Sequence, residues 1–178
     1  MARISSRLGP GDWLKAGAKA LASAGPDALK AEPLAVRLKV SKGSFYWHFR
    51  DVPAFQKSLL QEWEVNALTH SEDVRDADDA PVAQLRSLAQ AFATLDKLEI
   101  AVRSWAQAHK GARRSVERID ASRLGFLQNA LTEIGIANPE MARIIYAAAI
   151  GMNGIGKQAP SDNAAAIGSL VDLVLALR

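Results

Sequence analysis

The sequence contains no cysteine, so it can form neither a disulfide framework nor a metal site built on thiolates. It also lacks an unbroken apolar run long enough to span a membrane, and its first eight residues carry two arginines without an apolar segment of their own. We therefore expect a cytoplasmic protein that is neither secreted nor bound to a membrane. Alternating segments rich in Val, Ile and Thr are missing as well, which disfavours a sheet protein.

Patterns typical of enzymes are equally scarce. The chain shows no nucleophile paired with a base and no glycine-rich phosphate loop, so we expect that it is not an enzyme. Of its three histidines, His70 and His109 lie far apart and have no companion ligands at helical spacing. The sequence therefore predicts no cofactor and no metal ion.

The charges are divided unevenly along the 178 residues, although 49% hydrophobic and 23% charged residues are typical of a globular protein. Residues 1–60 hold ten Lys and Arg against four Asp and Glu, whereas residues 61–178 hold twelve against fifteen. A basic first third followed by a mildly acidic remainder favours a polyanion-binding head on a body with another task. Nucleic acid is the leading candidate for that polyanion.

Helical spacing of apolar residues recurs along the chain, so we predict an all-α fold. The first helix is expected to begin after Gly9, with Pro10 at its first position, and to end at Gly25. Helices over residues 31–38, 42–49 and 53–70 follow, and the acid-rich segment 71–81 is predicted to be a solvated loop. The buried stripe of the first helix is predicted to comprise Leu14, Ala18, Leu21 and Ala22.

Beyond that segment, amphipathic patterns predict two helices and then a longer one over residues 112–134. The two final helices, over 140–156 and 162–177, are apolar nearly all round, and such helices must be buried on every side. The same two helices of a second copy would supply the cover, so we expect an obligate homodimer. Its predicted interface comprises Ala147, Gly151, Gly154, Leu170, Val174 and Leu177.

Residues 31–50 carry the pattern on which the functional prediction depends. They predict two helices joined by a turn of about three to four residues, which is the arrangement of a helix-turn-helix. Ser41 would cap the second helix, and the free amides after it suit a phosphate. Phe45 and Phe49 would face inward. The outward residues would be Lys42, Ser44, Tyr46, Trp47 and His48.

The outward residues suit a DNA surface. Lys42 adds a mobile positive charge, and the small Gly43–Ser44 pair lets the helix approach base edges. Tyr46 and His48 can donate hydrogen bonds to phosphate oxygens. Trp47 offers apolar contact, for example to a thymine methyl group.

The segment SKGSFYWHF over residues 41–49, with a basic helix before it and Phe55 after it, resembles the DNA-binding head of the tetracycline-repressor (TetR) family. The resemblance is dense from Gly9 to Leu60, and residues 103–127 are similar to the regulatory body of many members. It implies an effector-released repressor that binds a pseudo-palindromic operator in double-stranded DNA as a nine-helix, omega-like homodimer with an N-terminal three-helix head. The expected DNA contacts are Lys39, Ser41, Lys42, Gly43, Ser44, Tyr46, Trp47 and His48.

We accordingly expect a DNA-binding head over residues 1–55 and a helical body for effector binding and dimerisation over residues 56–178. Three residues depart from the family's pattern. Lys30 stands where many relatives cap the second helix with Thr or Ser, and Lys39 stands where the turn usually has Gly, at a position that often needs a positive φ. Val52 replaces a lysine that commonly contacts a phosphate. Either DNA affinity is modest, or Lys30 and Lys39 supply the missing charge.

An alternative function follows from these departures. The chain could be a helical ligand-binding or adaptor protein whose DNA-binding head has degenerated. In either case the unknown small-molecule effector is predicted to be partly apolar, because aromatic and apolar residues of the body could line a pocket. Core packing is the competing role for each residue of this set, which comprises Phe92, Trp105, Phe126, Tyr146 and Met152.

Overall fold

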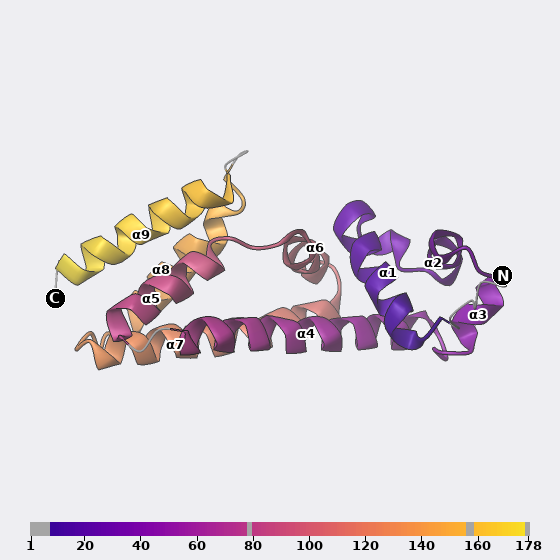
Figure 1. The fold of residues 1–178 in the computed structure, drawn as a ribbon, viewed down its shortest axis with the longest axis horizontal. Coiled ribbons are helices and arrows are strands. Elements are labelled where there is room, and N and C mark those ends of the chain that lie inside the picture. Colours follow the sequence, from indigo (N-terminus) through magenta and orange to yellow (C-terminus); the bar gives the residue numbers. More distant parts are fainter. Residues whose placement is uncertain (1–7, 78–79, 156–158, 177–178) are drawn as a thin grey trace, which may run out of the picture. The chain divides into compact units, whose positions relative to one another are not determined.

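The computed structural model describes residues 8–77, 80–155 and 159–176, and within these ranges the chain forms nine α-helices, one 3-10 helix and no strand (Figure 1). The prediction of an all-α fold is confirmed. No helix in the described ranges is long and apolar enough to cross a membrane. The elements are α1 (Pro10–Ala24), η1 (Pro26–Ala28), α2 (Ala31–Leu38), α3 (Lys42–Tyr46), α4 (Val52–Asp76), α5 (Pro81–Phe92), α6 (Lys97–Ala106), α7 (Lys110–Glu133), α8 (Pro139–Met152) and α9 (Pro160–Ala176).

The chain folds into two compact units. The head unit comprises residues up to Trp63 together with Lys97–Ser115, and the body unit comprises Glu64–Asp96 together with residues from Val116 onward. Helices α4 and α7 contribute residues to both units, and α6 belongs to the head unit, where it packs on α1. This division differs from the expected boundary between residues 55 and 56. The assignment of DNA binding to residues 1–55 and of effector binding and dimerisation to residues 56–178 stays a prediction.

Helix α1 begins and ends as its sequence predicts, but it buries a different face. The Asp12 carboxylate accepts a hydrogen bond of 2.8 Å from the Gly9 amide, and Gly25, at a φ of 76°, ends the helix. The buried residues are Trp13, Gly17, Ala20 and Leu21, whereas Leu14, Ala18 and Ala22 are half-buried. The predicted stripe is therefore wrong except at Leu21, because the large Trp13 ring takes the core position.

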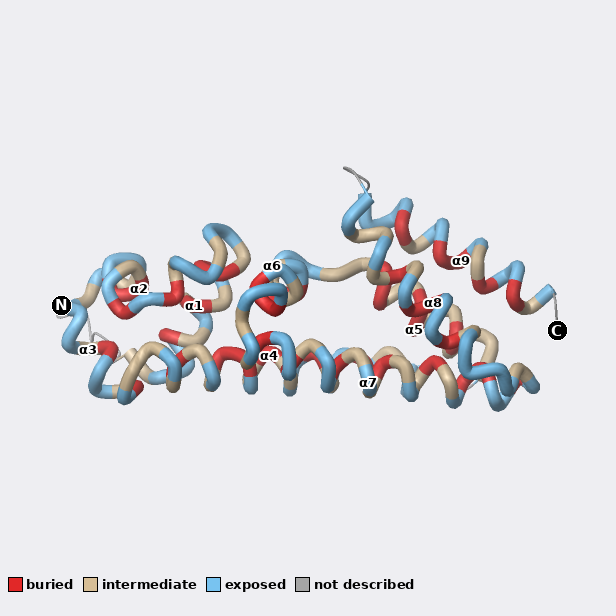
Figure 2. The backbone as a smooth tube through the Cα atoms, turned by 180° about the vertical axis from the view of Figure 1, so that it is seen from behind, coloured by how far each residue is buried: buried red, intermediate tan, exposed pale blue. Residues whose placement is uncertain are grey.

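The body unit is built around the contacts that α5, α8 and α9 make with one another (Figure 1). Buried positions recur along one face of each of these helices (Figure 2). The face of α7 that belongs to the body unit joins the same core. Fully buried members of this core include Leu85, Leu88, Leu127, Leu131, Ile145, Ile167 and Val171.

The acid-rich segment after residue 70 is helical as far as Asp76, so the prediction of a loop is wrong for residues 71–76. Ser71 is completely buried, and its hydroxyl donates a hydrogen bond of 2.7 Å to the Ala67 carbonyl. Val74 packs against the body core, while Glu72 and Asp73 are exposed. The helix continues because it has a buried side there, which the density of acidic residues conceals in the sequence.

Candidate nucleic-acid interface

The turn between α2 and α3 is closed by backbone hydrogen bonds. The Val40 amide donates to the Ala35 carbonyl at 3.0 Å, and the Lys39 amide donates to the Val36 carbonyl at 3.2 Å. This pair of bonds is the Schellman arrangement, which requires a left-handed residue at the end of the helix. That residue is Lys39, with φ 55° and ψ 43°. The expected positive φ at Lys39 is confirmed, and the turn forms although a lysine occupies it.

Buried aromatic rings anchor α3 on its inward side. Phe45 is completely buried, and its ring lies 5.3 Å from that of Trp13 and 5.4 Å from that of Phe55, edge to face in both cases. Phe49 packs on the Phe55 ring at 5.0 Å, so the prediction that Phe45 and Phe49 face inward is confirmed. Helix α3 ends at Tyr46, earlier than expected, and a helix this short depends on such packing.

The opposite face of α3 is open. Trp47 is 82% exposed and Tyr46 is 51% exposed, which are large values for aromatic side chains. Ser44 and His48 are half-buried. None of the eight expected DNA-contact residues is buried, and the exposed members of the set are Lys39, Ser41, Lys42, Gly43, Tyr46 and Trp47.

Neither helix of the motif has a side-chain cap at its N-terminus. Ser41 occupies the capping position of α3 with an extended backbone, but its hydroxyl makes no capping hydrogen bond. Lys30 occupies the capping position of α2, where a lysine cannot accept from the free amides, and its ammonium group instead lies 3.1 Å from Asp27 Oδ1. The expected loss of the α2 cap is confirmed.

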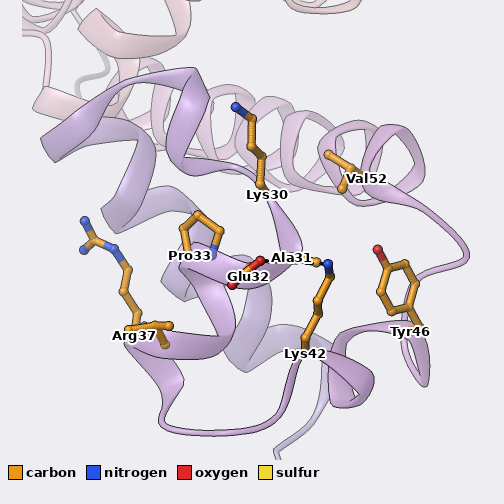
Figure 3. Close-up of a pocket in the computed structure, with 9 residues that line it drawn as sticks. Lys30, Ala31, Glu32, Pro33, Arg37, Lys42, Tyr46 and Val52 are labelled. Carbon is orange, nitrogen blue, oxygen red and sulfur yellow. Dashed lines mark ion pairs between the residues drawn. The ribbon is translucent and has the colours of Figure 1, made fainter.

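A hollow of about 720 Å³ lies between the start of α2, helix α3 and the start of α4 (Figure 3). Tyr46, one of the expected DNA contacts, lines it, and Val52 lines it where the family's pattern has a lysine. Its charged residues are three cations and one carboxylate. They are Lys30, Arg37, Lys42 and Glu32.

The start of α4 adds further charge beside this hollow. The Asp51 carboxylate accepts hydrogen bonds of 2.7 Å from the Ala54 amide and 2.9 Å from Arg50 Nε. These two hydrogen bonds lower the pKa of the Asp51 carboxyl below its ordinary value of 3.8, and the bond from the Ala54 amide has the larger effect. Arg50 and Lys57 are exposed and line a second, smaller hollow. The sequence-based set of contacts omits Arg37, Arg50 and Lys57, and the basic composition of residues 1–60 was the only signal for them.

The structure brings together only part of the expected effector pocket. The rings of Phe92 and Tyr146 meet edge to face at 5.7 Å in the body unit. Phe126 is half-buried beneath the Arg75 guanidinium, which lies 4.9 Å from its ring, and Met152 is half-buried at the end of α8. Trp105 belongs instead to the head unit, where its ring stacks on that of His109.

Polar residues that the sequence analysis did not single out accompany Phe92 and Tyr146. The Tyr146 hydroxyl donates a hydrogen bond of 2.7 Å to Asp120 Oδ1. Arg123 is buried, with its guanidinium 5.0 Å from the Phe92 ring, and its Nε donates to Ser71 Oγ at 3.3 Å. The spacing of Asp120 and Arg123 along α7 could not predict these contacts, because the partners lie on α4, α5 and α8.

The residues expected at the dimer interface divide by exposure. Ala147, Gly151 and Gly154 are exposed and Leu170 is half-buried, so all four offer surface to a partner. Val174 is only 7% exposed, because it packs into the core of its own body unit, and it presents almost no surface to a second copy. Leu177 lies outside the described residues. Large apolar residues exposed on the same two helices and just beyond α8 are Ile144, Ile155 and Leu173.

The helix-turn-helix matches a known protein family. Residues 14–51 match the model of the family described as bacterial regulatory proteins, tetR family. The chain is 29% identical over 145 residues to the tetracycline repressor protein class A from transposon 1721 of Escherichia coli. This match covers 79% of the chain and 64% of the repressor, so the chain spans less than two thirds of the length of this curated relative.

Solved structures with a similar fold cover most of the chain. A transcriptional regulator from Rhodococcus sp. has a TM-score of 0.78 at 20% identity, covering 94% of this chain and 96% of its own. For a TetR-family transcriptional regulator from Streptomyces coelicolor, the TM-score is 0.71 at 15% identity, with 92% and 86% covered. For a ketosteroid transcriptional regulator of Mycobacterium tuberculosis, it is 0.62 at 17% identity, with 98% and 94% covered. At these identities the likeness establishes the fold.

Proposed function

Because the chain belongs to the TetR family of bacterial regulatory proteins, we propose that it is a transcriptional regulator that binds operator DNA as a homodimer. We further propose that it is a repressor released by a small-molecule effector. The observation that carries the proposal is the pair of faces on α3. Phe45 anchors the helix on buried rings, while Tyr46 and Trp47 stand exposed on its outer side beside the cation of Lys42.

Residues of α3 and the two that follow it each have a role in this proposal. A recognition helix contacts base edges with its N-terminal residues, where Lys42 can donate to guanine or to a phosphate. Gly43–Ser44 leave room for close approach to the bases. Tyr46 and His48 donate to phosphate oxygens, and the indole of Trp47 contacts a thymine methyl group.

The homodimer places two copies of α3 on one duplex. Two recognition helices should enter successive major grooves about 34 to 36 Å apart on a pseudo-palindrome. The exposed apolar residues of α8 and α9 support a two-fold interface between copies. Effector binding in each body would favour a spacing of the helices that no longer matches the operator, provided that the effector binds the released state more tightly.

Phe92 and Tyr146, with Asp120 and Arg123 beside them, support a site for a partly apolar effector with a polar group. A saturating effector should weaken operator binding. If the operator affinity stays unchanged with every candidate ligand, release by effector is wrong.

The direct test is selection of genomic fragments by the purified protein, followed by binding measurements on the selected duplex. The affinity should fall by roughly a thousandfold or more between about 50 and 200 mM salt, because phosphate contacts release counterions. Lys42→Gln and Tyr46→Phe should weaken binding to all sequences, whereas Ser44→Ala and Trp47→Ala should change the preferred sequence. Lys97→Gln is the matched control, because Lys97 is an exposed lysine outside the motif.

Absent or salt-insensitive retention would favour the alternative function, a ligand-binding or adaptor protein with a degenerate head. An unaltered affinity and sequence preference in all four variants would remove the contacts assigned to α3. A fall in affinity for Lys97→Gln as large as that for Lys42→Gln would show that net charge, and not the motif, is responsible.

A further inference from the structure

A carboxylate lies on the face that should approach DNA. Glu32 belongs to the first turn of α2 and lines the same hollow as Lys42 and Tyr46. Its carboxylate and the Lys42 ammonium group point toward one another, with Oε2 3.9 Å from Nζ (Figure 3). Both side chains are well exposed, 75% for Glu32 and 57% for Lys42. The pair therefore links the first residue of α3 to α2 across open solvent.

This position conflicts with the attraction of a basic head for phosphates. Charges separated by less than about 8 Å interact at physiological salt, so a carboxylate this close to Lys42 reduces the attraction of the ammonium group for a phosphate. An exposed ion pair at 3.9 Å is weak and can be broken at little cost. A phosphate or a guanine edge offers Lys42 a stronger partner, because two or more acceptors can converge on it.

We propose that Glu32 holds the Lys42 ammonium group in the free protein and competes with DNA for it. Lys42 exchanges the carboxylate for DNA on binding, and each protomer gives up one ion pair. Glu32 thereby lowers the affinity for operator and unrelated DNA by the same factor. The inference rests on the proposed function, and it assigns to Glu32 a role in setting how tightly the head binds.

The test compares Glu32→Gln, Lys42→Gln and the double variant on the selected operator and on an unrelated duplex. Glu32→Gln should bind both duplexes about two- to tenfold more tightly, because two exposed ion pairs are no longer lost per dimer. The slope of log affinity against log salt should steepen by roughly one to two. In the Lys42→Gln background, removal of the Glu32 charge should change the affinity by less than twofold, because there is no ammonium group left to compete for.

Glu133→Gln is the matched control. Glu133 is an exposed glutamate on α7 in the body unit, and its replacement makes the same change in net charge. Its affinity and salt slope should equal those of the wild type. An equal gain in this control would trace the effect to net charge and overturn the proposal.

Three other results would overturn it. An unchanged Glu32→Gln variant would mean that the ion pair does not influence binding, and an equal gain with and without Lys42 would mean direct repulsion of phosphates. Weaker binding with a lost preference at one base pair would show instead that Glu32 accepts from a cytosine amino group. A wild-type protein that binds no duplex at all would overturn the proposed function itself, which distinguishes the two failures.

Discussion

Gly17 shows how packing overrides helix propensity. It lies in the interior of α1, where glycine is less favourable than alanine by about 1 kcal/mol. A Cβ atom added there would stand 2.5 Å from the Phe55 ring, and that ring is completely buried, with Phe45 and Phe49 packed against it. The glycine thus lets α1 and α4 approach closely enough for the rings beneath α3 to pack.

We predict that Gly17→Ala lowers the free energy of unfolding by about 1 to 3 kcal/mol, because overpacking outweighs the gain in propensity. Gly11→Ala is the control, since nothing lies within 4 Å of a Cβ atom at that exposed position. It should be neutral or stabilising by up to about 1 kcal/mol. Urea unfolding of the three proteins measures both changes. A Gly17→Ala protein as stable as the wild type would mean that the Phe55 ring can move aside.

Other single residues show where prediction from sequence stops. The inward positions of Phe45 and Phe49 followed from their spacing, because residues four apart lie on the same side of a helix. Helix α9 gives no such contrast. Leu173 and Val174 are equally apolar neighbours, yet Leu173 is 58% exposed and Val174 is 7% exposed. A helix that is apolar all round does not reveal from its sequence which side faces its own core.

Helix α2 has an unfavourable residue at each end. Its N-terminus lacks a side-chain cap at Lys30, and its C-terminus places Lys39 in the left-handed region. Both features could be predicted from the sequence, because a lysine stands at each of these positions. Lysine can neither cap the free amides nor adopt the left-handed conformation as easily as glycine. The Schellman hydrogen bonds and the packing of the motif keep the turn in this conformation.

Lys39→Gly should raise the free energy of unfolding by about 1 kcal/mol, because glycine adopts the left-handed conformation without the steric penalty of a Cβ atom. Lys39→Ala separates this effect from the loss of the lysine, since alanine keeps the penalty and should give no gain. Thermal and urea unfolding provide the measurement. The backbone at Lys39 would prove unstrained if the glycine variant were no more stable than the alanine variant.

The length of α4 could not be predicted from the local sequence pattern. Residues 71–76 were predicted as a loop because acidic residues dominate them, but Ser71 and Val74 face the body core. The helix continues here because Ser71 is accommodated in the interior. Its hydroxyl donates to the preceding turn and accepts a hydrogen bond from Arg123 of α7. Local composition carries no information on a contact with a residue 52 positions away.

The helical fold and the helix-turn-helix could both be predicted from the sequence, because both depend on the local periodicity of apolar residues. The sequence could not assign each aromatic residue to a unit. Trp105 and Phe92 lie close in sequence, but α6 packs on α1 in the head unit whereas α5 packs on α8 and α9 in the body unit. Such assignments depend on long-range packing, which no pattern along one helix contains.

The proposed homodimer needs an exposed apolar surface on α8 and α9. Leu173 is 58% exposed on α9, and the exposed Ala147 and Gly151 on α8 are small enough to let a second helix approach. Leu173→Glu should convert the protein to a monomer at micromolar concentration, because two like charges would be buried about the two-fold axis. Operator affinity should then fall at least about 100-fold, since each half-site is bound without the other.

Sedimentation and operator binding of the same samples test this prediction, with circular dichroism to show that the helices remain. Thr132→Glu is the control, because it adds the same charge at an exposed position on α7 and should leave the dimer intact. A wild-type protein that sediments as a monomer would contradict the homodimer. A Leu173→Glu protein that remains dimeric would place the interface elsewhere, because a glutamate at the centre of an apolar interface cannot keep its hydration.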